Sequence, residues 1–136
     1  MFAMTNEKGQ AVAFPDVCKT PMPPLGEPVP IPYPNEATMI EADVATCSKS
    51  VFICGAKALT LRTQIMSSQG DDAGIEMGVV SEEVMGPMGF TMGSEMVFMD
   101  GAPAVFLDSL TKHNGECPNA EGATISPSQV KVSVAP

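Results

Sequence analysis

The sequence is poor in basic and aromatic residues. It has no tryptophan, one tyrosine and one histidine, and seven lysine and arginine residues stand against sixteen aspartate and glutamate residues. The net charge of −9 repels phosphate backbones and anionic bilayers, so we expect neither nucleic-acid binding nor stable membrane insertion. The first residues lack the basic and apolar regions of a secretory signal. We therefore expect a protein made in the cytosol that is exported only if a machine carries it out folded.

Long runs of alanine, leucine, glutamate and lysine at helical spacing are also absent. Glycine (12), proline (13) and methionine (11) are abundant instead, and they favour turns and short strands over a helical bundle. A length of 136 residues is that of one ordinary domain. The composition therefore predicts a single all-β domain.

Eight of the thirteen prolines lie within residues 14–35. Proline fixes φ and removes a backbone donor, so we expect neither a helix nor a central strand there. The residues between the prolines are largely apolar, whereas a disordered linker would carry polar ones. The pattern predicts an extended, ordered N-terminal strap held against a surface. A disordered segment or an SH3 ligand is the alternative.

Two segments, 51–61 and 97–107, repeat each other at an offset of 46 residues. Both follow the pattern Val-Phe-x-x-Gly-Ala-x-Ala-x-x-Leu. In each, two apolar runs flank a dipeptide, Cys54-Gly55 or Asp100-Gly101, that suits a two-residue turn. The repeat predicts two equivalent β-hairpins.

Three further stretches give weaker indications. We expect residues 67–74 to form a loop whose carboxylates, like those of Glu82 and Glu83, are solvated. Glycine and proline interrupt the methionine-rich stretch 83–99, which predicts turns and short strands with the methionines as core filler. Val130, Val132 and Val134 alternate with polar residues, which predicts a strand at 130–134.

No catalytic motif is present, but His113 and Cys117 lie four positions apart across a glycine-containing turn. Such a pair can face one tetrahedral zinc ion. We expect Cys18 as a third ligand and either Cys54 or Cys47 as a fourth. One alternative is a surface histidine with an unrelated thiol; another is a small cysteine-dependent hydrolase or toxin that uses Cys117 and His113.

Several motifs together resemble the PAAR-like domain family of type VI secretion and related contractile injection systems. They are residues 14–21 (FPDVCKTP), 28–35 (PVPIPYPN), 67–74 (SSQGDDAG), 78–81 (GVVS), 111–115 (TKHNG) and 127–136 (PSQVKVSVAP). The resemblance covers nearly everything after about residue 12, so we expect an extension at 1–12 and one PAAR-like domain at 13–136.

The resemblance implies a small cone of short strands with pseudo-threefold character. Its base would cap a trimeric VgrG-type spike protein, and its point would lead through a target membrane. PAAR domains hold zinc near the point with histidine and cysteine, for which His113, Cys117 and Cys18 are the candidates. Leu107 and Asp108 stand near where a second family histidine is expected. The implied protein is not an enzyme; it can recruit a separate effector, assembles in the bacterial cytoplasm and leaves on the apparatus without a signal peptide.

Overall fold

The computed structural model describes residues 1–24 and 26–136. In these residues there is no α-helix, only two 3-10 turns, η1 (Met39–Glu41) and η2 (Val44–Thr46), which confirms the all-β prediction. No helix in the described part has the length and apolar character that crossing a bilayer requires. The strands are β1 (Gln10–Thr20), β2 (Val29–Thr38), β3 (Phe52–Ile53), β4 (Ala56–Lys57), β5 (Gln64–Ile65), β6 (Met88–Phe90), β7 (Phe98–Met99), β8 (Ala102–Pro103), β9 (Leu110–His113) and β10 (Ala120–Ser126).

Six strands form one antiparallel sheet in the order β2-β1-β10-β9-β6-β5. The sheet curls so that its edge strand β2 faces the segment after β5. Glu36 on β2 exchanges two backbone hydrogen bonds with Gln69 of that segment, each 2.7 Å long. The enclosed core is built from small and flexible side chains more than from aromatic ones. Its members are Met4, Ala11, Ala37, Met39, Ala42, Cys47, Leu59, Ile65, Met88, Phe90 and Val105.

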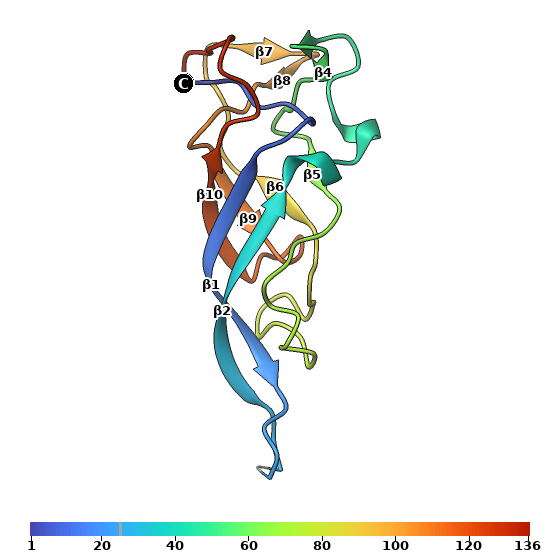
Figure 1. The fold of residues 1–136 in the computed structure, drawn as a ribbon, viewed down its shortest axis with the longest axis vertical. Coiled ribbons are helices and arrows are strands. Elements are labelled where there is room, and N and C mark those ends of the chain that lie inside the picture. The colour runs from blue at the N-terminus through green and yellow to red at the C-terminus, as the bar shows by residue number, and fades with distance from the viewer. Residues whose placement is uncertain (25) are drawn as a thin grey trace.

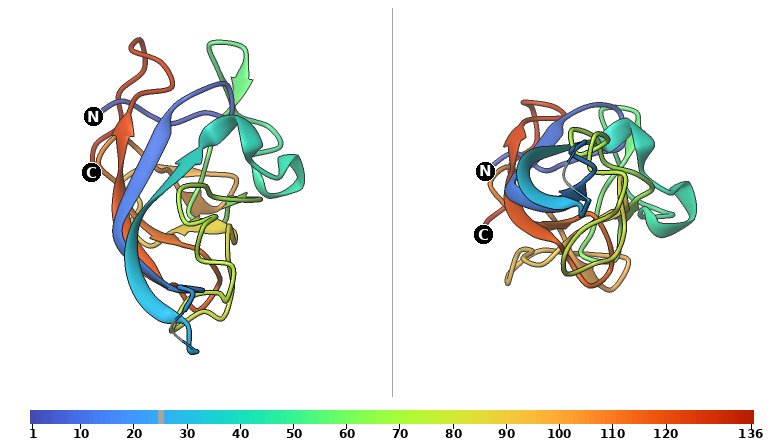
Figure 2. Two further views of the ribbon diagram at one scale, coloured as in Figure 1. Left: turned by 60° about the horizontal axis from the view of Figure 1, so that its bottom comes forward. Right: turned by 90° about the horizontal axis from the view of Figure 1, so that it is seen from below.

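The molecule tapers from a broad end to a narrow end (Figure 1). The hairpins β3–β4 and β7–β8 lie at the broad end, and the outer part of the β1–β2 hairpin forms the narrow end. Both chain termini lie close together near the broad end (Figure 2).

The proline-rich segment is extended, as predicted, but the expectation that no central strand runs through it is wrong, because β1 lies between β2 and β10. The segment forms both arms of the β1–β2 hairpin. Pro30 and Pro32 stand opposite Lys19 and Val17. The backbone groups of Lys19 and Val17 point away from β2. The amide of Lys19 donates to the carbonyl of Met77, and the carbonyl of Val17 accepts from the amide of Val79. The prolines therefore occupy positions where β2 needs no donor, and they face solvent along an edge.

β1 is a central strand despite Pro15, because it pairs with β2 on one side and with β10 on the other. The β1–β2 register shifts between Ala13 and Asp16, around the proline. A register shift accommodates the missing donor without ending the strand.

The two predicted hairpins are confirmed. β3 pairs with β4, and β7 pairs with β8. The turn residues Cys54 and Gly55 have φ of 52° and 81°, and Asp100 and Gly101 have 52° and 78°. Positive φ at both positions is the signature of the type I′ turn that suits a two-residue hairpin.

Two other sequence predictions are wrong. The stretch 130–134 has a single β-bridge at Ser133 and no strand, because the Gln129 side chain accepts the amides of Lys131 and Val132. The methionines of 83–99 are not all core filler: Met88 is fully buried, but Met85 and Met96 are exposed. Met88 belongs to the core, and Met99 on β7 packs against a second buried cluster while partly exposed.

Candidate functional site

At the broad end, three segments distant in sequence meet in a closed cycle. The amide of Met4 donates to the carbonyl of Val105 at 3.1 Å, Val105 donates to Leu59 at 3.3 Å, and Leu59 donates back to Met4 at 3.0 Å. All three residues are fully buried. Each segment is thus donor to one neighbour and acceptor from the other.

The same hydrogen bonds recur in each of the three units. An alanine amide donates to a valine carbonyl at 3.0 to 3.1 Å in the pairs Ala58–Val51, Ala104–Val97 and Ala3–Val132. A side-chain oxygen accepts the amide of each of these valines in the pairs Ser48–Val51, Ser94–Val97 and Gln129–Val132. The units therefore share backbone geometry and a capping side chain.

The two chain ends pair with each other in the same antiparallel way, without a connecting turn, and we call this pair the third hairpin. Phe2 bridges Ser133, and the amide of Val134 donates to the carbonyl of Met1 at 2.8 Å. These contacts match the pairing in β3–β4 and β7–β8, with the termini standing where the other two units have their turns. The boundary between an extension at 1–12 and a domain at 13–136 stays a prediction. Residues 3–5 of that segment are nevertheless buried within the cycle.

Each turn also contacts the capping residue of a neighbouring unit. Ser48 donates to Asp100, Ser94 donates to the carbonyl of Ala135, and Cys54 Sγ lies 3.9 Å from Gln129 Oε1. Hydrogen bonds from the Ser48 and Ser50 side chains and nearby amides lower the pKa of the exposed Asp100 carboxyl. These contacts join the three units into one platform.

The hairpins of this platform present large apolar side chains to solvent. Phe52 and Phe98, at equivalent positions of β3 and β7, are 57% and 58% exposed. Met96, just before β7, is 75% exposed. Exposed aromatic side chains on a rigid scaffold are typical of a surface that contacts a partner.

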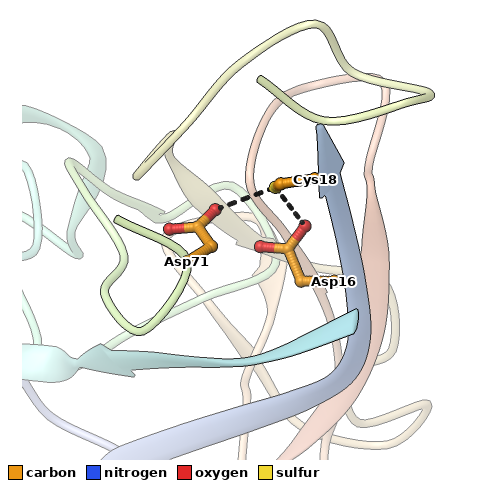
Figure 3. A group of neighbouring side chains, drawn as sticks. All are labelled: Asp16, Cys18 and Asp71. Carbon is orange, nitrogen blue, oxygen red and sulfur yellow. Dashed lines mark hydrogen bonds between the residues drawn. The ribbon is translucent and has the colours of Figure 1, made fainter. Parts of the chain in front are cut away.

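A second feature, a cluster of buried polar side chains, lies towards the narrow end. Asp16 and Cys18 on β1 face Asp71 from a loop (Figure 3). One ligand atom from each residue lies within 4.8 Å of the others, and all three residues are fully buried. Two carboxylates and a thiol at this spacing can hold a metal ion.

Burial controls the protonation of this cluster. Burial raises the pKa of Asp71 to about 7. The hydrogen bond that Asp71 makes with Asp16, and the negative charge of Asp16, act in the same direction. Burial alone would also raise the pKa of Asp16, but hydrogen bonds from Asp71 and from three asparagine side chains lower it. Burial, followed by the charges of Asp16 and Asp71, raises the pKa of the Cys18 thiol. At a pH below about 7 the cluster therefore holds one carboxylate, Asp16, and a protonated thiol.

The structure separates the predicted zinc ligands. His113 is fully buried, with Nδ1 2.7 Å from Asn35 Oδ1 and Nε2 2.8 Å from Thr111 Oγ1. Because an amide oxygen only accepts, Nδ1 carries the proton and Nε2 accepts from Thr111. Burial lowers the pKa of His113 to about 4, so the ring is neutral. Neither it nor Cys117 belongs to the group around Cys18.

The other cysteines also stand apart. Cys117 and Cys54 are exposed thiols, whereas Cys47 is buried in the core cluster, to which Cys18 does not belong. Burial raises the pKa of Cys47. Zinc held by His113, Cys117, Cys18 and a fourth cysteine stays a prediction.

Sequence reasoning missed the carboxylates of the cluster. The expectation that the loop 67–74 carries solvated carboxylates is wrong for Asp71, which is fully buried, and right for Asp72, which is exposed. Asp16 and Asp71 are 55 positions apart, so no local spacing joins them. The one available signal was that both lie within motifs of the family resemblance.

The comparisons with known proteins agree on one family. The profile described as "Toxin PAAR-like domain" matches residues 9–120. A curated relative, the DNase toxin Tse7 of Pseudomonas aeruginosa, is 35% identical over 107 residues, which are 75% of this chain and 27% of the toxin. The chain thus spans about a quarter of that relative's length. No solved structure matches the chain.

Proposed function

Because the chain belongs to the toxin PAAR-like domain family, as its match over residues 9–120 shows, we propose that it is the tip of a contractile injection spike of the type VI secretion kind. In this role the broad end is the base of a small pseudo-threefold cone and sits on a trimeric VgrG-type spike protein. The narrow end is the point that leads through the target membrane. The protein acts mechanically and catalyses no reaction.

The closed cycle of Met4, Leu59 and Val105 carries this proposal. A single chain that builds three equivalent hairpins around one axis can match a threefold axis of a homotrimer, one hairpin to each subunit. The exposed Phe52 and Phe98 supply apolar contact area on two of the three hairpins.

The β1–β2 hairpin supports the mechanical role of the narrow end. Its prolines restrict φ and reduce the entropy of any unfolded alternative, so the hairpin resists bending and local unfolding. We propose that the protein assembles in the bacterial cytoplasm and leaves on the apparatus, with an effector recruited as a separate chain.

The DNase activity in the name of the relative is not proposed for this chain, since the match covers 27% of that toxin. The cysteine-hydrolase alternative needs an accessible histidine beside a reactive thiol. His113 is fully buried and both its ring nitrogens are hydrogen-bonded, while Cys117 is exposed. This geometry favours the mechanical role.

Gel filtration of the purified chain with a trimeric VgrG-type spike tests the proposal. We expect one peak that contains both proteins at about 10 μM, a concentration at which a standard-size interface is formed. The variant Met22→Asp, which places a charge near the narrow end, should co-elute as well as the parent. Separate elution of the parent chain, or loss of co-elution on changing Met22, would contradict the proposed orientation.

A further inference from the structure

The narrow half of the molecule is organised around the Asp16 carboxylate. Oδ1 accepts from the Cys18 thiol at 3.4 Å, from Asn114 Nδ2 at 3.2 Å and from Asn119 Nδ2. Oδ2 accepts from Asn35 Nδ2 at 2.9 Å. Four side-chain donors, from β1, β2 and the β9–β10 connection, thus converge on one buried carboxylate.

Asp71 adds a fifth hydrogen bond. Its oxygens accept the amide of Met85 at 3.2 and 3.3 Å, and its carboxyl group faces Asp16. Two buried carboxylates in contact cannot both be ionised at low cost, so one keeps a proton. Asp71, with fewer donors around it, is the protonated partner, and its hydroxyl donates to Asp16.

These hydrogen bonds occupy the lone pairs that a metal ion needs. A carboxylate offers about four lone-pair positions, and the five donors around Asp16 fill them. Among the described residues, no buried side-chain nitrogen or oxygen lacks a hydrogen-bond partner. A cation at this position would meet amide hydrogens from Asn114 and Asn119. Their Nδ2 atoms would keep their bonds to the carbonyls of Glu83 and Val17, but each would lose its bond to Asp16 in a buried site.

The network extends to His113. Asn35, which donates to Asp16, also donates to Ser68 Oγ at 3.0 Å and accepts from the His113 ring. Two of the residues that the family resemblance implies as zinc ligands, His113 and Cys18, thus serve here as hydrogen-bonding groups.

From this geometry we propose that the narrow half is held together by the hydrogen bonds around Asp16 and needs no metal ion, with Asp71 acting as a neutral donor and not as a ligand. The network joins β1 to β2 through Asn35 and to the loops that carry Asp71, Asn114 and Asn119. It takes the place of the zinc ion that the family resemblance implies. The proposal does not depend on spike binding, so the two can fail separately.

The two aspartates distinguish a network from a metal site. In Asp71→Asn, the new amide nitrogen donates to Asp16 and the new oxygen accepts from Met85, as the protonated carboxyl does. We expect its melting temperature to stay within about 2 °C of the parent. Asp16→Asn removes the one charged acceptor of several buried donors, and should lower the melting temperature by about 8 °C or more. Asp72→Asn, a change at the exposed neighbour, is the control and should shift nothing.

Metal analysis of the whole chain keeps the proposal testable if Asp16→Asn does not fold. Protein purified from zinc-supplemented medium should hold less than about 0.1 equivalents of zinc, and a chelator should move its melting temperature by less than about 1 °C. Bound zinc near one equivalent with a chelator-induced drop in melting temperature would overturn the proposal. Equal destabilisation by Asp16→Asn and Asp71→Asn would overturn it too, since a metal would need both ligands.

Discussion

Gly122→Ala is expected to leave almost no folded protein, with a loss of more than about 4 kcal/mol in the free energy of unfolding. A Cβ atom on Gly122 would lie 1.9 Å from the Val12 carbonyl oxygen and 2.7 Å from Ala13 Cα. Both are backbone atoms of β1. That strand cannot move aside, because β2 holds its other edge. The change therefore breaks the β1–β10 pairing at the centre of the sheet.

Gly89→Ala is the matched control. Gly89 lies on β6 of the same sheet, but a Cβ there meets only the Lys112 side chain, with Cε at 3.1 Å. A flexible lysine can turn away, so we expect a change below about 1 kcal/mol. Urea denaturation of both variants gives the comparison. A Gly122→Ala protein as stable as the parent would contradict the register of β1 against β10.

The double variant Phe52→Asp, Phe98→Asp is expected to weaken binding to the trimeric spike by more than about 100-fold. Both side chains are more than half exposed, so the change should cost the free chain little stability. In the proposed complex it would place two charges in a desolvated apolar contact, where each costs several kcal/mol.

Ile75→Asp provides the control for this surface. Ile75 is 64% exposed, in the loop that follows Asp71. The next residue, Glu76, donates its amide to the carbonyl of Lys19 on the β1–β2 hairpin, at the opposite end from the hairpin platform. The Ile75→Asp variant should bind the spike with the affinity of the parent, as measured by isothermal titration calorimetry. If the double variant binds as tightly as the parent, the platform is not the contact surface.

The features that could be predicted from the sequence are those determined by residues close together in the chain. Cys54-Gly55 and Asp100-Gly101 determine their turns within a few residues, so both hairpins follow from the repeat alone. The family could be predicted too, because its motifs are short continuous stretches of the sequence. The all-β class follows from the scarcity of helix-forming runs.

The remaining features depend on long-range contacts. The third hairpin joins residues 1–2 to 133–134, and no repeat pattern reveals a unit that is split between the two chain ends. The network around Asp16 draws on donors up to 103 positions away. The place of Pro30 and Pro32 in a strand depends on which way the opposite amides point, which is decided by the segment 76–79.

The central claim is that one chain presents three equivalent hairpins to three identical subunits. The mass of the complex with the trimeric VgrG-type spike, measured by native mass spectrometry, tests it most directly. The account predicts one copy of this chain for three spike chains, with no second copy bound when the chain is in excess. A complex of three copies on three spike chains, or no complex at all, would contradict it.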